Sequence, residues 1–234
     1  EISTRDWSSD VCSSDLEFIP IAEETGTIVP IGAWALLEAL THLSEWIAAG
    51  WCPRDATMAV NVSPRQLNDP NFVNVVSEAL TRAHIPARQL WLEVTENVMI
   101  SQPDQALLAL SKLGDLGVRV AIDDFGTGYS SLSLLQRFPI HRLKIDRSFV
   151  AGVADKPEAR ALVRTIIAMC DSLGLDTVAE GVESVPQLHA LNELRCAKAQ
   201  GYLISHPVPP EQMASTIALL SDVGSWPRIR SPRN

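Results

Sequence analysis

Two adjacent carboxylates at the end of an apolar run are the first sign of chemistry in this sequence. Residues 118–122 lead into Asp123 and Asp124, and Gly126 and Gly128 follow. Neighbouring side chains of a regular strand point to opposite faces, so the aspartates converge only if the strand ends there and the glycines turn the chain. Such a pair suits two metal ions about 3.5–4 Å apart, with one carboxylate bridging them. Taken alone, the same residues would equally form a capped turn.

The sequence alternates between strand-like and helix-like segments along most of its length. Six apolar runs read as strands, and each is followed by a segment with apolar residues at helical spacing. One such helical segment starts at Pro103 and stops at Gly117, as a helix should. Regular alternation of this kind predicts a parallel sheet. The expected strands are residues 57–63, 90–96, 118–126, 141–150, 176–183 and 198–205.

Two parallel architectures fit a chain of 234 residues: a TIM-type (β/α)8 barrel and a doubly wound open sheet. No G-x-G-x-x-G motif follows the first expected strand, which weakens the second architecture. Almost every expected strand ends in a polar side chain, and a barrel gathers its strand ends into one ring at the carboxyl-terminal face. We therefore predict an α/β fold of the TIM-barrel type. The polar groups at the strand ends are Asn61, Glu93 with Glu96, Asp123 with Asp124, Lys144 with Asp146, Glu180 with Glu183, and Gln200.

Carboxylates gathered on one face repel one another strongly unless cations lie between them, which is itself an argument for bound metal. Glu93, Glu180 and the neutral Asn61 would complete an oxygen shell beside the two aspartates. The histidines and cysteines show no zinc-type spacing, so oxygen ligands would hold magnesium, manganese or calcium. Lys144 would be a fixed positive charge that holds a nucleophilic water or steadies a phosphate oxygen.

The bulk composition narrows the class of protein. Hydrophobic residues make up 46% of the chain, which is typical of a globular protein. The net charge of -9 argues against a surface that binds a nucleic-acid polymer. Four widely spaced cysteines indicate reduced thiols and a cytoplasmic location, and no apolar run is long enough to span a membrane.

The first sixteen residues differ from the rest of the chain in their sequence pattern. The segment "EISTRDWSSDVCSSDL" repeats Ser-Ser-Asp at 8–10 and 13–15, has no periodicity, and joins abruptly to "EFIPIAEETG". We predict that residues 1–16 are a non-native or disordered leader and exclude them from the fold; a natural flexible leader is the alternative. Residues 17–222 are expected to form the barrel domain, and 223–234 a tail or linker.

Seven motifs follow residue 16, and singly several of them would be weak. They are "EFIPIAEETG" (17–26), "AVNVSPRQL" (59–67), "LEVTE" (92–96), "AIDDFGTGYSSL" (121–132), "LKIDRSFV" (143–150), "VAEGVE" (178–183) and "AQGYLIS" (199–205). Taken together, these motifs resemble the EAL domain family, the cyclic di-GMP phosphodiesterases. This resemblance implies a TIM-type barrel, two Mg²⁺ or Mn²⁺ ions, and hydrolysis of one phosphodiester of cyclic di-GMP to linear pGpG in bacterial second-messenger signalling.

The resemblance also implies roles for the metal ligands. Asn61, Glu93 and Asp123 resemble the ligands of the first ion, and Asp123 also resembles the bridge between the two ions. Asp124 and Glu180 resemble ligands of the second ion. The alternative for Asn61 is a cap on the turn that follows its strand.

Catalytic and pocket roles follow from the same resemblance. Glu180 is implied to accept the proton of the attacking water, with Lys144 as its positioning partner. Glu96 resembles the residue that anchors the "DFGTGYSS" loop, and Glu183 and Gln200 resemble substrate-binding pocket residues. Glu183 has an alternative role as a carboxylate at a helix start.

The sequence departs from the family at one important point. In the family, the Glu-Ala-Leu motif lies on a strand that would come before residue 17 here, and an arginine that contacts substrate phosphate usually follows it. In this sequence, the predicted leader, residues 1–16, occupies that place and contains no such motif. The Glu-Ala-Leu triplets at 38–40 and 78–80 both fall within helical patterns. We therefore expect the chain to lack its first strand, one metal ligand and a phosphate contact, and to be weakly active or inactive unless the native upstream strand is restored.

This departure leaves an alternative function open: a non-catalytic module that binds cyclic di-GMP or a partner protein. A weaker alternative is an unrelated metal-dependent barrel, such as an enolising aldolase, for which no acid/base pair suited to carbon chemistry can be singled out. The family resemblance implies a homodimer and an upstream sensory or GGDEF domain. The chain is accordingly expected to be cytoplasmic, or the cytoplasmic part of a longer membrane-attached protein.

Overall fold

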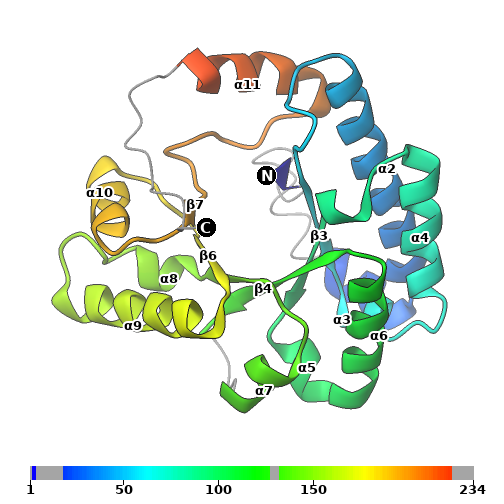
Figure 1. The fold of residues 1–234 in the computed structure, drawn as a ribbon, viewed down its shortest axis with the longest axis horizontal. Helices are drawn as coiled ribbons and strands as arrows, with labels where there is room; N and C mark the ends of the chain where they lie inside the picture. The colour runs from blue at the N-terminus through cyan, green and yellow to red at the C-terminus, as the bar shows by residue number, and fades with distance from the viewer. Residues whose placement is uncertain (1, 4–17, 127–131, 223–234) are drawn as a thin grey trace.

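The computed structural model describes residues 2–3, 18–126 and 132–222. Within this part of the chain, seven parallel strands form one sheet whose order follows the sequence, and helices surround them in Figure 1. A doubly wound sheet would instead reverse its order part-way, so the predicted α/β fold of the TIM-barrel type is confirmed. The strands are β1 (Ile2–Ser3), β2 (Met58–Val62), β3 (Leu90–Thr95), β4 (Arg119–Phe125), β5 (Arg142–Ile145), β6 (Asp176–Ala179) and β7 (Lys198–Ala199).

The helices follow the strands in turn, as the alternating sequence predicted. A helix over Phe18–Thr25 precedes α2, and short 3-10 turns η1 (Ala87–Gln89) and η2 (Pro210–Gln212) precede β3 and α11. Helix α9 ends at Leu173, and Gly174 caps it with a left-handed φ of 70°. The remaining helices are α2 (Ile28–Ala48), α3 (Pro64–Leu67), α4 (Phe72–Ala83), α5 (Asn97–Ser101), α6 (Pro103–Asp115), α7 (Leu132–Arg137), α8 (Arg147–Val150), α9 (Pro157–Leu173), α10 (Val185–Glu193) and α11 (Met213–Asp222).

The two faces of each strand carry different kinds of side chain. On β3, Leu90, Leu92 and Val94 are fully buried in the main hydrophobic core, which the helices share. Trp91 and Glu93 alternate with them and are also buried, and Trp91 belongs to a separate small apolar cluster. Because side chains alternate along a strand, these two residues lie on the inner face. The candidate site is built on that inner face.

All six predicted strands are shorter in the structure, and the difference is largest for β5, β6 and β7. β5 stops at Ile145 because Asp146 caps α8: its Oδ1 accepts a hydrogen bond from the backbone N–H of Ser148 at 2.9 Å. The predicted strand 176–183 ends at Ala179, and the predicted strand 198–205 ends at Ala199.

The predicted leader contributes to the sheet at one point. Ile2 and Ser3 form β1 and pair in parallel with Met58 and Ala59 of β2. The exclusion of residues 1–16 from the fold therefore does not hold for these two residues. Residues 4–17 and the predicted tail, 223–234, lie outside the described residues.

Two helices precede β2 on the outside of the sheet. The helix Phe18–Thr25 meets α2 at an angle of 118°, and only this bent pair, not either helix alone, has the length and apolar composition of a membrane span among the described residues. The side chain of Arg65, after β2, donates to the backbone oxygen of Glu23 at 2.7 Å. The end of the first helix is therefore held against the segment that follows β2.

Candidate active site

A buried lysine joins three strands at the centre of the candidate site. Lys144 Nζ on β5 lies 2.7 Å from Oε2 of Glu93 on β3 and 3.1 Å from Oδ1 of Asp123 on β4. It also lies 2.7 Å from Oε1 of Glu180, directly after β6. The side chains of Lys144, Glu93 and Asp123 are each 1% exposed, and that of Glu180 is 14% exposed. The convergence of these four groups, expected from their places at the strand ends, is therefore present.

The electrostatics of this cluster keep the lysine charged. Burial alone would lower the pKa of Lys144, but Glu93, Asp123 and Glu180 together raise it above its ordinary value. Burial also raises the pKa of Glu180 to about 7; Lys144 opposes this shift, and Asp123 and Glu93 add to it. A carboxyl group with a pKa near neutrality can exchange a proton at ordinary pH, which suits a general base.

The turn that brings the two aspartates together occurs at Asp124 itself. Asp124 adopts a left-handed φ of 53°, and the pairing of β4 with β5 shifts register between Ile122 and Phe125. The backbone N–H of Asp124 donates to Oδ1 of Asp123 at 3.0 Å. The sequence had assigned this turn to Gly126 and Gly128, which is wrong for its start, because aspartate also tolerates the left-handed region. Gly128 lies outside the described residues.

Three carboxylates are close enough to hold a metal ion. Asp123, Asp124 and Glu180 each offer an oxygen, and these oxygens lie within 4.8 Å of one another. Hard oxygen donors of this kind fit magnesium or manganese. Asn61 of β2 pairs in register with Glu93 of β3, which places both on the inner face beside this cluster. The ligand roles of all five residues remain proposals.

Glu96 accepts a hydrogen bond from the segment that follows β4. The backbone N–H of Gly126 donates to Oε2 of Glu96 at 3.2 Å, and Glu96 is buried. This contact is the kind expected of a loop anchor. Residues 127–131 of the loop lie outside the described part of the chain, so the anchoring of the whole loop stays a prediction.

Gly126 is itself constrained by its surroundings. It has a φ of 100°, and a Cβ added there would lie 2.5 Å from the ring of Phe149 in α8. We expect Gly126→Ala to lower the free energy of unfolding by about 1–3 kcal/mol, because both the backbone and the ring must adjust. Gly50→Ala is the matched control, since Gly50 has a similar φ of 74° and open space around it. Urea denaturation of both variants checks this; equal losses would show that the Phe149 contact contributes nothing.

Glu183 and Gln200 flank Glu180 but have exposed side chains. The backbone N–H of Glu183 donates to Oε1 of Gln187 at 2.8 Å, directly before helix α10. The backbone N–H of Gln200 donates to the oxygen of Ala179 at 2.8 Å. Both residues thus have a main-chain role at the strand ends, and their side-chain roles in a substrate pocket stay predictions.

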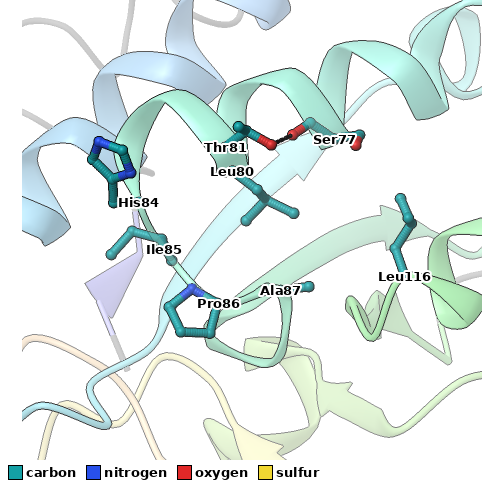
Figure 2. A pocket seen from close by; sticks show the side chains of 8 residues that line it. All are labelled: Ser77, Leu80, Thr81, His84, Ile85, Pro86, Ala87 and Leu116. Atoms are coloured by element: carbon teal, nitrogen blue, oxygen red, sulfur yellow. Dashed lines mark hydrogen bonds between the residues drawn. The ribbon is translucent and has the colours of Figure 1, made fainter.

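A separate pocket of about 490 Å³ lies on the outside of the sheet (Figure 2). Its lining includes Leu80 at the end of α4, Ile85, and Leu116 after α6. None of the predicted site residues lines it. The candidate site is therefore the charged cluster on the inner face and not this pocket.

The family model for the EAL domain matches residues 6–207. The chain belongs to this family. The match begins within residues 1–16, which were predicted to be a leader outside the domain. The Glu-Ala-Leu triplets at 38–40 and 78–80 lie within α2 and α4, as predicted, so neither is carried on a strand.

Two curated relatives of this EAL domain are longer than the chain. The chain is 41% identical over 201 residues to the signaling protein YkoW of Bacillus subtilis. The aligned segment covers 86% of this chain and 25% of YkoW. It is 42% identical over 202 residues to the bifunctional diguanylate cyclase/cyclic di-GMP phosphodiesterase MucR of Pseudomonas aeruginosa. The aligned segment covers 86% of this chain and 29% of MucR. The chain thus spans between a quarter and a third of the length of these relatives.

A solved structure agrees with the fold of this EAL domain. The PaMucR phosphodiesterase in complex with c-di-GMP superposes with a TM-score of 0.80 and 42% sequence identity. The match covers 85% of this chain and 80% of that one. The fold described above is thus similar to the fold of this solved structure.

Two further buried side chains next to the site were not predicted from the sequence. Arg142 lies two residues before Lys144 on β5, and Trp91 lies two residues before Glu93 on β3. Both are buried. The two-residue period of a strand was the available signal, because it places each of them on the inner face of the EAL domain.

Proposed function

We propose that the chain hydrolyses cyclic di-GMP to linear pGpG in a metal-dependent reaction, within bacterial second-messenger signalling. The observation that carries this proposal is the contact of Lys144 with Glu93, Asp123 and Glu180 beside the three-carboxylate cluster. The names of MucR, a cyclic di-GMP phosphodiesterase, and of the PaMucR complex with c-di-GMP support the choice of substrate.

Each residue has a distinct part in this reaction. Divalent ions held by Asp123, Asp124 and Glu180, with Asn61 and Glu93 as further ligands, would lower the pKa of water and offset phosphate charge. Glu180 accepts the proton of the attacking water, which its pKa of about 7 favours.

Lys144 orients the water and stabilises charge on the phosphate oxygens. The water oxygen bonds to phosphorus, the bond from phosphorus to one ribose 3′ oxygen breaks, and that oxygen takes up a proton. The linear product keeps its phosphate at the 5′ end. Glu183 and Gln200 are proposed to contact the nucleotide from the rim.

Metal removal tests the proposal directly. We expect EDTA to abolish conversion of cyclic di-GMP to pGpG, because the developing charge on phosphate would then lack its counter-charge, and excess Mg²⁺ or Mn²⁺ to restore it. Chromatography of the nucleotides before and after incubation measures both species. Product formation that persists at full rate in EDTA would contradict metal dependence.

A non-catalytic module that binds cyclic di-GMP is the second candidate. The observation in its favour is that the Lys144 ammonium already lies within 3.1 Å of three carboxylates and balances part of their charge without an ion. Titration calorimetry with cyclic di-GMP separates the two functions. Tight binding with no pGpG after hours in Mn²⁺ would favour the module.

A further inference from the structure

The residue that follows Glu180 lies against the first residue of helix α8. Gly181 adopts a left-handed φ of 64°, and a Cβ added there would lie 2.5 Å from Cβ and 3.4 Å from Cα of Arg147. Carbon atoms in contact are ordinarily about 3.5–4.0 Å apart, so the shorter of these distances is a clash. Only glycine therefore fits at position 181 while both segments keep their places.

The Cβ of Arg147 belongs to a fixed helix start and not to the end of a flexible side chain. Arg147 is the first residue of α8, and the side chain of Asp146 caps this helix by accepting a hydrogen bond from the backbone N–H of Ser148. Asp146 follows Lys144 by two residues, directly after β5. The start of α8 is thus fixed to the strand that carries the buried lysine of the site.

On its other side, the segment after Glu180 lies against the segment after β7. The backbone N–H of Val182 donates to the oxygen of Gln200 at 3.0 Å, and that of Leu203 donates to the oxygen of Val182 at 3.0 Å. A Cβ added at Gly201 would overlap the backbone of Val182. The described residues on this side therefore leave little room for the segment to move away from α8.

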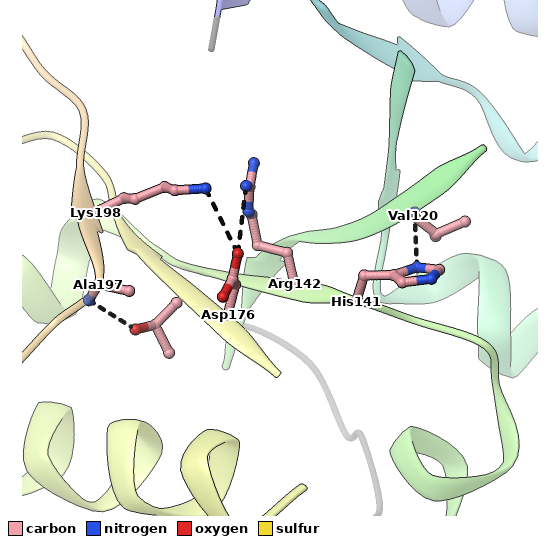
Figure 3. A network of polar contacts seen from close by, with 7 residues as sticks. Val120, His141, Arg142, Asp176, Ala197 and Lys198 are labelled. Atoms are coloured by element: carbon pink, nitrogen blue, oxygen red, sulfur yellow. Dashed lines mark hydrogen bonds and ion pairs between the residues drawn. The ribbon is translucent and has the colours of Figure 1, made fainter. Parts of the chain in front are cut away.

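The amino-terminal end of β6 also contacts both neighbouring strands (Figure 3). Oδ2 of Asp176 lies 3.6 Å from Nη2 of Arg142 on β5 and 3.5 Å from Nζ of Lys198 on β7. All four residues of β6 pair in register with β5. A clash at the carboxyl-terminal end of β6 is therefore relieved locally, next to Glu180, and not by a shift of the whole strand.

The place of the Glu180 carboxylate matters because its contacts are short. Its Oε1 lies 2.7 Å from Nζ of Lys144, and it shares the three-carboxylate cluster with Asp123 and Asp124. A displacement of even a fraction of an ångström would lengthen these contacts. Replacing a group that orients a metal ligand typically costs about 10–100-fold in metal affinity or activity.

We propose that Gly181 is a positioning residue for Glu180. Because position 181 carries no side chain, the start of α8 lies directly against this segment and sets the place of the Glu180 carboxylate relative to Lys144 and the three-carboxylate cluster. Gly181 acts through Glu180 and does not touch the substrate. The inference rests on the function proposed above, since it takes Glu180 to be a metal ligand.

Calorimetric titration of Mn²⁺ into the whole chain tests this role without any need for turnover. Gly181→Ala should weaken Mn²⁺ binding about tenfold, because the new methyl group displaces Glu180. Gly174→Ala is the matched control, since Gly174 has a similar φ of 70° and open space around it. It carries the same backbone cost without the contact, so its affinity for Mn²⁺ should equal that of the unmodified chain.

A second substitution, at Arg147, separates positioning from a general loss of stability. Arg147→Gly removes the Cβ that the new methyl group would meet, and should restore Mn²⁺ affinity to Gly181→Ala. Arg147→Ala removes the guanidinium group but keeps that Cβ, and should restore nothing. A merely structural effect would give the opposite order, because glycine destabilises a helix more than alanine does.

Two results would overturn this inference alone. One is a Mn²⁺ affinity of Gly181→Ala equal to that of Gly174→Ala, and the other is an equal effect of Arg147→Gly and Arg147→Ala on Gly181→Ala. Circular dichroism checks that each variant keeps the fold. If Gly181→Ala fails to fold, Gly181→Asn takes its place in both comparisons, because asparagine tolerates the left-handed region and still brings a Cβ.

The same titrations distinguish failure of this inference from failure of the proposed reaction. Binding of Mn²⁺ that weakens in Gly181→Ala and returns with Arg147→Gly would support the positioning role even if no pGpG forms, and would then count only against hydrolysis. A chain that binds no Mn²⁺ would overturn both the positioning role and the metal-dependent reaction.

Discussion

Lys144→Met should lower the free energy of unfolding by about 3–5 kcal/mol when measured in EDTA, because removing one partner of a buried ion pair leaves the other charges uncompensated. Lys144 contacts Glu93, Asp123 and Glu180, and two of these three carboxylates are as buried as the lysine. Methionine keeps most of the volume of the side chain, so the loss reports charge rather than a cavity. Urea denaturation followed by circular dichroism measures the change.

Metal should return part of this loss. Without the ammonium, the carboxylates repel one another more strongly, so Mn²⁺ should stabilise Lys144→Met by more than it stabilises the unmodified chain. Lys112→Met is the control, since Lys112 is exposed and its replacement should stay within about 0.5 kcal/mol. If Lys144→Met proved as stable as Lys112→Met, the lysine would not be what balances these carboxylates.

The convergence of the site was predictable from the sequence, because parallel strands bring their carboxyl ends to one edge of the sheet. Glu93, Asp123, Lys144 and Glu180 required only the correct identification of their strands, and each of those strands is present. The side chains of Glu183 and Gln200 lie beyond regular strand, so strand geometry did not fix their direction. Their exposure could not be predicted in this way.

Local backbone geometry was harder to predict than the position of the strands. The apolar run that includes Phe149 and Val150 reads as strand, but the cap at Asp146 starts α8 there instead. The left-handed turn at Asp124 was likewise attributed to the glycines, which adopt such angles more readily. In both cases a single aspartate, through its own hydrogen bond or backbone angle, overrides the average preference of its neighbours.

Asp123→Asn should reduce hydrolysis of cyclic di-GMP by at least about 100-fold. Asp123 belongs to the three-carboxylate cluster and also contacts Lys144 at 3.1 Å, so the amide removes charge from both. Bound metal supplies several kcal/mol to such reactions, and each 1.36 kcal/mol corresponds to a factor of ten. Initial rates of pGpG formation at saturating Mn²⁺ measure the effect. Calorimetric titration of Mn²⁺ should give a weaker affinity in the same variant.

Asp146→Asn is the matched control for this substitution. It makes the same chemical change in a nearby aspartate, and asparagine caps a helix about as well as aspartate does, so α8 should be retained. Its rate and its affinity for Mn²⁺ should equal those of the unmodified chain. Loss of Mn²⁺ affinity in Asp123→Asn alone places that carboxylate at the metal whether or not the chain turns over. An Asp123→Asn variant with unchanged rate and unchanged affinity would remove Asp123 from the proposed ligand set.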